Sequence, residues 1–196
     1  MTTPQAVLNH PNTQPHKPKA ITHDTSINAL LHLIRRLEAN LTPPANPAEQ
    51  WWSYIPLPLD HWFENMATIR QTLGPGTHQY LELGSGIGTK LALANELGYH
   101  TLGIEHHQPY IDTSRRIFPH CHVIHSDAAN PNHNLQPQYQ NADIIYNYAL
   151  ATNAEDHHRI NRNITKHMKP EALYYQPRPP HPTWLEHIHG HVWRKP

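Results

Sequence analysis

The residues best suited to chemistry are glycines and acids grouped around one short stretch, 84–88, which reads GSGIG. Glu82 precedes the first glycine by two positions, and Glu105 ends the next apolar segment. Glycine admits positive φ angles and, lacking a Cβ, lets the backbone pass close to a ligand. A carboxylate at the end of the second strand of such a unit can accept hydrogen bonds from ribose hydroxyls. The arrangement therefore predicts a nucleoside site, with a tight turn that binds nothing as the alternative.

The spacing of the glycines indicates which nucleoside to expect. The fingerprint of dinucleotide-binding proteins is Gly-x-Gly-x-x-Gly or Ala. Counted from Gly84, its last position falls on Thr89, and counted from Gly86 it falls on Leu91, so both readings miss. This argues against a nicotinamide-dependent oxidoreductase. The observed order is Glu-x-Gly-x-Gly-x-Gly, which resembles the turn of class I S-adenosylmethionine-dependent methyltransferases.

The resemblance implies a role for each residue near the turn, with S-adenosylmethionine as the cofactor. The methionine end of the cofactor would lie against Glu82, Gly84, Ser85, Gly86 and Gly88. Glu105 would bind the ribose hydroxyls. The adenine would lie near His106, Asp127 and Ala128. The alternatives are a turn cap for Asp127 and a surface position for His106.

The resemblance also indicates where the methyl acceptor would bind. In this family the residues just past the fourth strand border the transferred methyl group. Here Asn147 and Tyr148 are expected to meet the acceptor as catalytic residues, and Tyr146 to line its site or to belong to the core. An aromatic linker at 47–59 would form a pocket wall, or a cover over one edge of the core, through Trp51, Trp52 and Tyr54.

The elements that must position these residues follow from the pattern of apolar segments. Short apolar segments, typical of buried strands, occur at 80–83, 101–104, 121–124, 142–146 and 172–175. Helical patterns separate several of them, so we expect an α/β fold with a doubly wound, mostly parallel sheet and helices on both faces. The tail is shorter than the last two strands usual in the family. We therefore expect a sheet truncated at its end, with a short hairpin of 184–188 and 192–194.

The chain divides into three parts. Residues 1–24 are mostly Pro, Asn, Thr, Gln and His, and are predicted to form a mobile arm. Residues 25–76 are expected to form a helical extension that includes the aromatic linker. Residues 77–196 are expected, from the resemblance, to form the Rossmann-like core that would bind the cofactor.

Charge and cysteine usage bound the partners and the compartment. The chain has 15 basic and 15 acidic side chains and no basic run, so we expect neither nucleic acid nor a membrane surface as partner. The single cysteine, Cys121, excludes an intrachain disulfide. No apolar segment is long enough for a signal peptide or a membrane span, and a cytoplasmic protein is expected.

The 20 histidines raise the question of a metal site. Neighbouring pairs such as His106-His107 and His157-His158 do not have the His-Glu-x-x-His spacing of zinc sites. Cys121 has no Cys-x-x-Cys partner. No metal site is predicted.

The function expected from these features is methyl transfer to a small molecule. The segment after the fourth strand lacks the Asn/Asp-Pro-Pro-aromatic sequence of enzymes that methylate base amino groups. A protein side chain of the lysine type is the second acceptor class, because the ending Gly103-Ile104-Glu105 looks like that of some protein-lysine methyltransferases. A non-catalytic module of the same fold, binding a nucleoside or a partner, is the alternative outside enzymes.

Overall fold

The computed structural model describes residues 25–39, 58–130, 132, 134–148, 154–177 and 181–196. The predicted arm, 1–24, lies outside the described residues, as do the linker aromatics Trp51, Trp52 and Tyr54.

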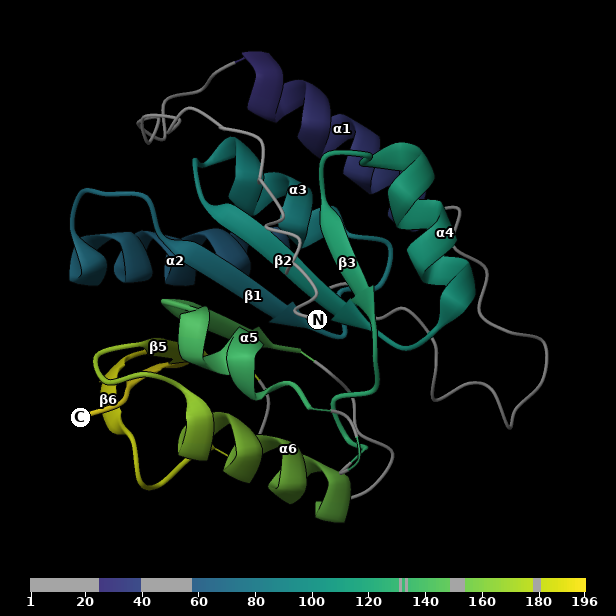
Figure 1. Ribbon diagram of the computed structural model, residues 1–196. Coiled ribbons are helices and arrows are strands. Elements are labelled where there is room, and N and C mark those ends of the chain that lie inside the picture. The colour runs from purple at the N-terminus through teal and green to yellow at the C-terminus, as the bar shows by residue number, and fades with distance from the viewer. Residues whose placement is uncertain (1–24, 40–57, 131, 133, 149–153, 178–180) are drawn as a thin grey trace, which may run out of the picture.

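The described chain begins with two helices and continues as alternating strands and helices (Figure 1). The first helices are α1 (Thr25–Ala39) and α2 (Leu59–Leu73). The alternating part consists of β1 (Gln79–Leu83), α3 (Thr89–Glu96), β2 (His100–Glu105), α4 (Gln108–Ile117), β3 (His122–His125), α5 (Gln136–Asn141), β4 (Ile144–Asn147), α6 (Ala154–His167) and β5 (Leu173–Tyr175). It ends in a hairpin of β6 (Glu186–His189) and β7 (Val192–Arg194).

The strands form one seven-stranded sheet in the order β3-β2-β1-β4-β5-β7-β6. The first five strands in this order run parallel to one another, while β7 is antiparallel to both β5 and β6. The chain order reverses between β1 and β4, where such sheets leave a crevice at the carboxyl ends of the strands. The predicted doubly wound, mostly parallel sheet is confirmed.

The predicted hairpin is present as β6 and β7, so the sheet is not truncated at its last two strands. Gly190 takes a φ of 54° in the turn of the hairpin, a conformation that glycine adopts without strain. The described residues that connect β5 to β6 contain no helix.

Alternating side chains build a core on each face of the sheet. On β1, Tyr80 belongs to the cluster that faces α1, α2 and α3, whereas Leu81 and Leu83 belong to the cluster that faces α5 and α6. In Figure 1, α1 lies beside α3, and α5 lies beside α6. Glu82 therefore points to the same face as Tyr80, under the start of α3.

Helix α3 is buried on more sides than its apolar stripe suggests. The sequence places Leu91, Leu93 and Ala94 largely on one side, yet Lys90 and Ala92 are also buried. Helix α1 packs against α3, and Lys90 lies close enough to the buried Glu82 for their charges to interact. The helix that follows the glycine turn is thus held from two directions.

Candidate cofactor and acceptor site

The glycine turn joins β1 to α3 at the carboxyl edge of the sheet. The φ angle is 67° at Gly84, 54° at Gly86 and 82° at Gly88. A residue with a Cβ would be strained at such positive φ angles. The N–H groups of Gly84 and Ser85 both donate to the carbonyl of Ile104, at 2.8 and 3.1 Å. The turn is therefore fastened to the end of β2.

The Glu105 carboxylate is 5% exposed and turned into the glycine turn. Its Oε2 accepts a hydrogen bond from the Gly86 N–H, and its Oε1 accepts from the N–H groups of His106 and His107, each at 2.8 Å. Burial alone would raise the pKa of this carboxyl. Hydrogen bonds from the His106 side chain and from the backbone N–H groups of His107 and Gly86 outweigh the effect of burial. The pKa of Glu105 therefore lies below its ordinary value. Glu105 is thus ionised and stabilises the turn.

Glu82 is the second acid of the site, and it is 3% exposed. Its Oε2 atom has no hydrogen-bond partner among the described residues. Burial raises the pKa of this carboxyl well above its ordinary value, the charge of Lys90 opposes the rise, and Glu105 adds to it. Buried polar atoms in folded proteins usually have a hydrogen-bond partner, and a bound ligand is one group that could provide it.

Close packing around the turn also involves Gly103 and Ser114, which were not expected to belong to the cofactor site. A Cβ at Gly88 would lie 2.5 Å from Ser114 Oγ, and a Cβ at Gly103 would lie 2.6 Å from Ser85 Oγ. A glycine inside an apolar strand is a signal of close backbone approach, so Gly103 was detectable. Nothing in the local sequence marks Ser114, or Lys90 as a buried cation.

The residues expected near the adenine gather after β2 and β3. The carbonyl of His106 lies 2.9 Å from His125 Nε2, which joins the two strand ends. Asp127 Oδ1 accepts a hydrogen bond from the Ala129 N–H at 2.8 Å, so this side chain closes its own turn. His106, Asp127 and Ala128 are all half-buried. The contact of any of them with an adenine stays a prediction.

The end of β4 sends its side chains to opposite faces of the sheet. The Asn147 side chain donates to the Tyr174 hydroxyl at 2.6 Å and to Asn161 Oδ1 at 3.3 Å. The Tyr174 hydroxyl donates in turn to the same Asn161 oxygen, at 2.6 Å. This buried triad joins β4, β5 and α6, and it occupies the amide hydrogens of Asn147.

On the other face, Tyr146 is fully buried within a group of tyrosines. The centroid of its ring lies 4.8 Å from that of Tyr175, 6.2 Å from that of Tyr148 and 6.3 Å from that of Tyr80. Tyr148 is only half-buried. Of the two tyrosines expected near the acceptor, Tyr148 is therefore the one with exposed surface.

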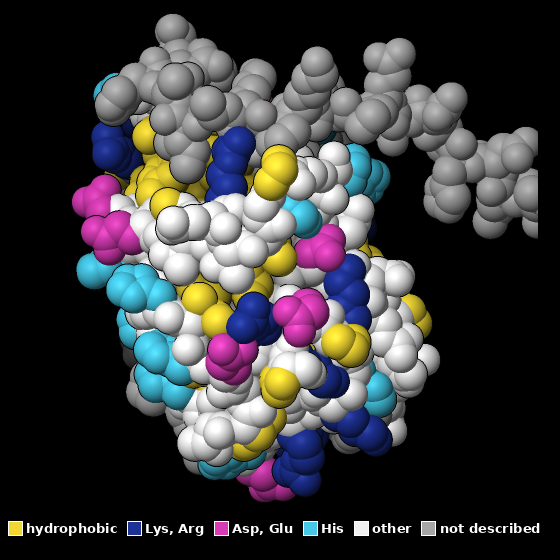
Figure 2. Space-filling model, turned by 90° about the vertical axis from the view of Figure 1, so that its left-hand side faces the viewer, with side chains coloured by type: hydrophobic (Ala, Val, Ile, Leu, Met, Phe, Trp, Pro, Cys, Tyr) yellow, Lys and Arg dark blue, Asp and Glu magenta, His cyan; other side chains and the backbone are white. Residues whose placement is uncertain are grey.

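Three further features of the described residues bear on the site. No group of three or more His, Cys, Asp or Glu side chains there is suited to hold a metal ion. Cys121 is buried, and burial raises the pKa of its thiol to about 12, with a further contribution from the charge of Glu82. No described helix is long and apolar enough to cross a membrane. On the face in Figure 2, basic side chains are interspersed with acidic ones.

Comparison with known proteins places this geometry in a structural class. No protein-family model matches the chain, and no curated protein matches its sequence. CalS10 of Micromonospora echinaspora, an amino pentose methyltransferase solved with S-adenosylmethionine bound, matches 75% of this chain and 55% of its own, with a TM-score of 0.50 and 13% identity. The plantazolicin methyltransferase BpumL, solved with S-adenosylhomocysteine, matches 78% of this chain and 53% of its own, with a TM-score of 0.51 and 13% identity.

The chain thus has the fold of class I S-adenosylmethionine-dependent methyltransferases. It spans a little over half the length of these two proteins.

Proposed function

We propose that this chain binds S-adenosylmethionine and transfers its methyl group to a small-molecule acceptor. The observation that carries the proposal is the glycine turn with its two buried acids, one ionised and committed to the backbone, the other with an unused acceptor atom. The fold supports the proposal, because ligands of such sheets bind at the carboxyl ends of the strands.

The residues present fit this cofactor. S-adenosylmethionine carries a sulfonium and an ammonium group, and Glu82 offers a buried carboxyl oxygen without a hydrogen-bond partner beside the turn. The exposed Gly84 presents no side chain that could stand in front of a ligand. We assign the methionine end to Glu82 and to the turn residues Gly84, Ser85, Gly86 and Gly88.

Glu105 has fewer free hydrogen-bond acceptor sites for a ribose than its position in the sequence implies. A carboxylate has about four lone-pair sites, and three backbone N–H groups of this chain already use Glu105. The free capacity is on Oε2, which accepts only from Gly86 among the hydrogen bonds given above. We therefore propose one ribose hydroxyl on Oε2, with His106, Asp127 and Ala128 around the adenine.

Bound S-adenosylmethionine supplies a methyl group that is already activated, so the protein has mainly to align the acceptor. Tyr148 is the residue we assign to the acceptor, because it is half-buried at the end of β4. Asn147 acts in this proposal by holding the end of β4 in place, since its amide hydrogens bond Tyr174 and Asn161. Tyr146 supports Tyr148 from the core, and Trp51, Trp52 and Tyr54 are proposed to complete the acceptor wall.

The small-molecule acceptor is favoured by the nature of the neighbours, which act on an amino pentose and on plantazolicin. The chain has 15 basic and 15 acidic side chains and no basic run, so we rank nucleic acid below the other acceptor classes. A lysine-type protein side chain is the second candidate acceptor, because the residues that end β2, Gly103-Ile104-Glu105, resemble those of some protein-lysine methyltransferases.

Two measurements on the full chain test the proposal. Calorimetry should show saturable binding of S-adenosylmethionine or S-adenosylhomocysteine and none of NAD. Incubation with a methyl-labelled donor should then label small molecules and release S-adenosylhomocysteine. Cofactor binding without release of S-adenosylhomocysteine would identify a non-catalytic module. Label found only in the protein fraction or only in the RNA fraction would show that the acceptor is a protein or an RNA and not a small molecule. Heat with NAD and none with the adenosyl compounds would refute the cofactor.

A further inference from the structure

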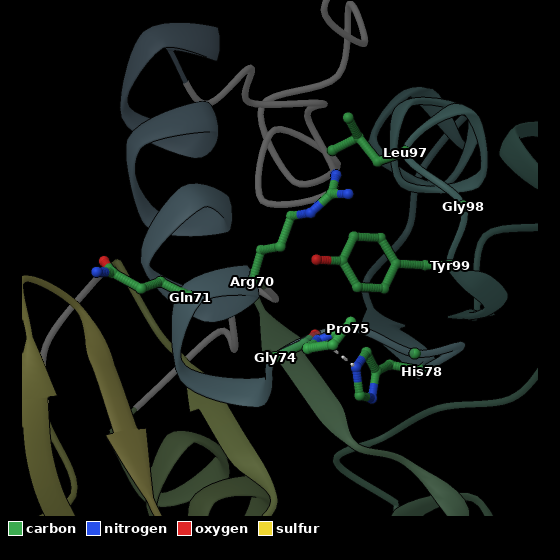
Figure 3. A pocket seen from close by; sticks show the side chains of 9 residues that line it. Arg70, Gln71, Gly74, Pro75, His78, Leu97, Gly98 and Tyr99 are labelled. Atoms are coloured by element: carbon green, nitrogen blue, oxygen red, sulfur yellow. Dashed lines mark hydrogen bonds between the residues drawn. The ribbon is translucent and has the colours of Figure 1, made fainter. Parts of the chain in front are cut away.

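A pocket lies at the amino-terminal edge of the sheet, at the other end of β1 from the glycine turn (Figure 3). Its volume is about 400 Å³, which lies in the range of small-molecule sites. The end of α2, the segment that leads into β1 and the end of α3 surround it. The side chains that matter for its chemistry are Arg70, Pro75, His78, Leu97 and Tyr99.

The polar groups of this pocket come from three elements. In Figure 3 the Arg70 side chain extends past the Tyr99 ring, so that its guanidinium lies between the Tyr99 hydroxyl and Leu97. Tyr99 is only 6% exposed, so its orientation is set by packing. His78 Nε2 lies 3.3 Å from the carbonyl of Gly74. Because a carbonyl can only accept, Nε2 carries the proton in this hydrogen bond.

The charge of the pocket favours an anion. Arg70 is permanently cationic, and none of the described lining residues is acidic. A guanidinium has five N–H donors, so Arg70 can bind a neighbour and a ligand together. Carbonyls at the ends of α2 and α3 would oppose an anion, but several of them already accept backbone hydrogen bonds, namely Arg70 O from Gly74, Asn95 O from Gly98 and Ala94 O from Tyr99.

We propose that this pocket binds a small organic carboxylate with an aromatic or apolar body. The carboxylate is bound by Arg70 and accepts from the Tyr99 hydroxyl, since a planar guanidinium matches a carboxylate with two parallel hydrogen bonds. The body lies against Leu97 and Pro75, of which Leu97 is 4% exposed. The site is separate from the glycine turn, and it stands or falls independently of the methyltransferase proposal.

Calorimetry on the full chain with benzoate as the probe tests the site, with benzamide as a neutral molecule of the same shape. Benzoate should bind saturably and benzamide should not. Arg70→Gln should weaken benzoate binding roughly 10- to 100-fold, the usual range for losing a charged hydrogen-bond partner. Tyr99→Phe should weaken it less. Arg115→Gln removes an exposed arginine on α4 and is the matched control, with unchanged affinity expected.

Three results would overturn the proposal. They are the absence of saturable benzoate binding to the wild-type chain, equal affinity in Arg70→Gln, and equal affinity for benzamide. Thermal melting reports whether each variant is folded. A measurement without variants guards against misfolding: benzoate should shift the NMR signals of the His78 and Tyr99 amides in the wild-type chain. Shifts confined to other regions would also refute the site.

Discussion

At the scale of single residues, Glu105 combines a structural role with a proposed binding role. Its carboxylate accepts three backbone hydrogen bonds at 2.8 Å while almost fully buried. Glu105→Ala leaves these N–H groups without their acceptor and should lower the free energy of unfolding by about 3 kcal/mol. S-adenosylmethionine binding should weaken roughly 10- to 100-fold. Urea denaturation and calorimetry measure the two effects.

The pH dependence of the Glu105 contribution follows from the direction of its pKa shift. The pKa is lower in the folded protein than the ordinary value of 4.5. The stabilisation is therefore fully present above about pH 4.5 and is lost as pH falls through the folded pKa.

The control for Glu105→Ala is Asp112→Ala, which removes an exposed carboxylate on α4 and should leave stability nearly unchanged. A Glu105→Ala variant as stable as wild type would contradict the hydrogen bonds assigned to this residue.

Glu82 should show the opposite pH dependence. Its pKa is higher in the folded protein than the ordinary value of 4.5, so the folded state holds its proton longer than the unfolded chain. Stability is then lost as pH rises from about 4.5 toward the folded pKa. Glu82→Gln removes this loss and should raise the melting temperature at pH 8 but not at pH 4. Cofactor binding should weaken roughly tenfold. A difference in melting temperature that is independent of pH would mean that Glu82 is ionised in the folded state.

At the scale of elements, the triad of Asn147, Asn161 and Tyr174 joins two strands to α6. Each hydroxyl and amide in it has a partner, and the residues are at most 2% exposed. Tyr174→Phe removes one hydroxyl and leaves buried partners unsatisfied, which should cost about 1–3 kcal/mol. Asn161→Ala should cost a similar amount.

The double variant with Tyr174→Phe and Asn161→Ala distinguishes one cooperative hydrogen-bond network from separate contacts. Both substitutions break the same network. The loss of unfolding free energy in the double variant, measured by urea denaturation, should therefore be about 1 kcal/mol smaller than the sum of the two single losses. Strictly additive effects would show that Asn161 and Tyr174 act independently.

At the scale of the whole molecule, histidine protonation changes the charge of an otherwise neutral chain. The 20 histidines accompany 15 basic and 15 acidic side chains, and Figure 2 shows histidines at several places on one face. His191 has a pKa below its ordinary value of 6.5, because of burial first and then of the neighbouring His181, His61 and His187. The unfolded chain therefore binds more protons there, and stability is lost as pH falls through about 6.5.

This effect is measurable as a fall in melting temperature between pH 7 and pH 5.5. His191→Gln should reduce the fall, whereas His100→Gln, at an exposed position on β2, should not. Since the His191 ring is partly exposed, screening keeps its share below about 1 kcal/mol, or roughly 2–4 °C. The opposite Glu82 effect is avoided by making the comparison in the Glu82→Gln background. Equal falls in both histidine variants would contradict a role for His191.

The sequence alone determined the features that depend on near neighbours along the chain. Glycines spaced two apart between an apolar strand and a helix predict a turn with positive φ, and all three take it. Five apolar segments, most of them separated by helical patterns, predict the five parallel strands of the sheet. These predictions succeed because backbone conformation and side-chain periodicity are local properties.

Tertiary structure decided the features that depend on partners far along the chain. Asn147 looks accessible in the sequence, yet its side chain is taken up by Tyr174, 27 positions away. Glu105 reaches back 19 positions to the Gly86 N–H, which limits what it can offer a ribose. Lys90 is buried near Glu82, and one oxygen of Glu82 is buried without a hydrogen-bond partner among the described residues. Periodicity predicts which face a side chain takes, but hydrogen-bond partners and burial depend on how the elements pack in three dimensions.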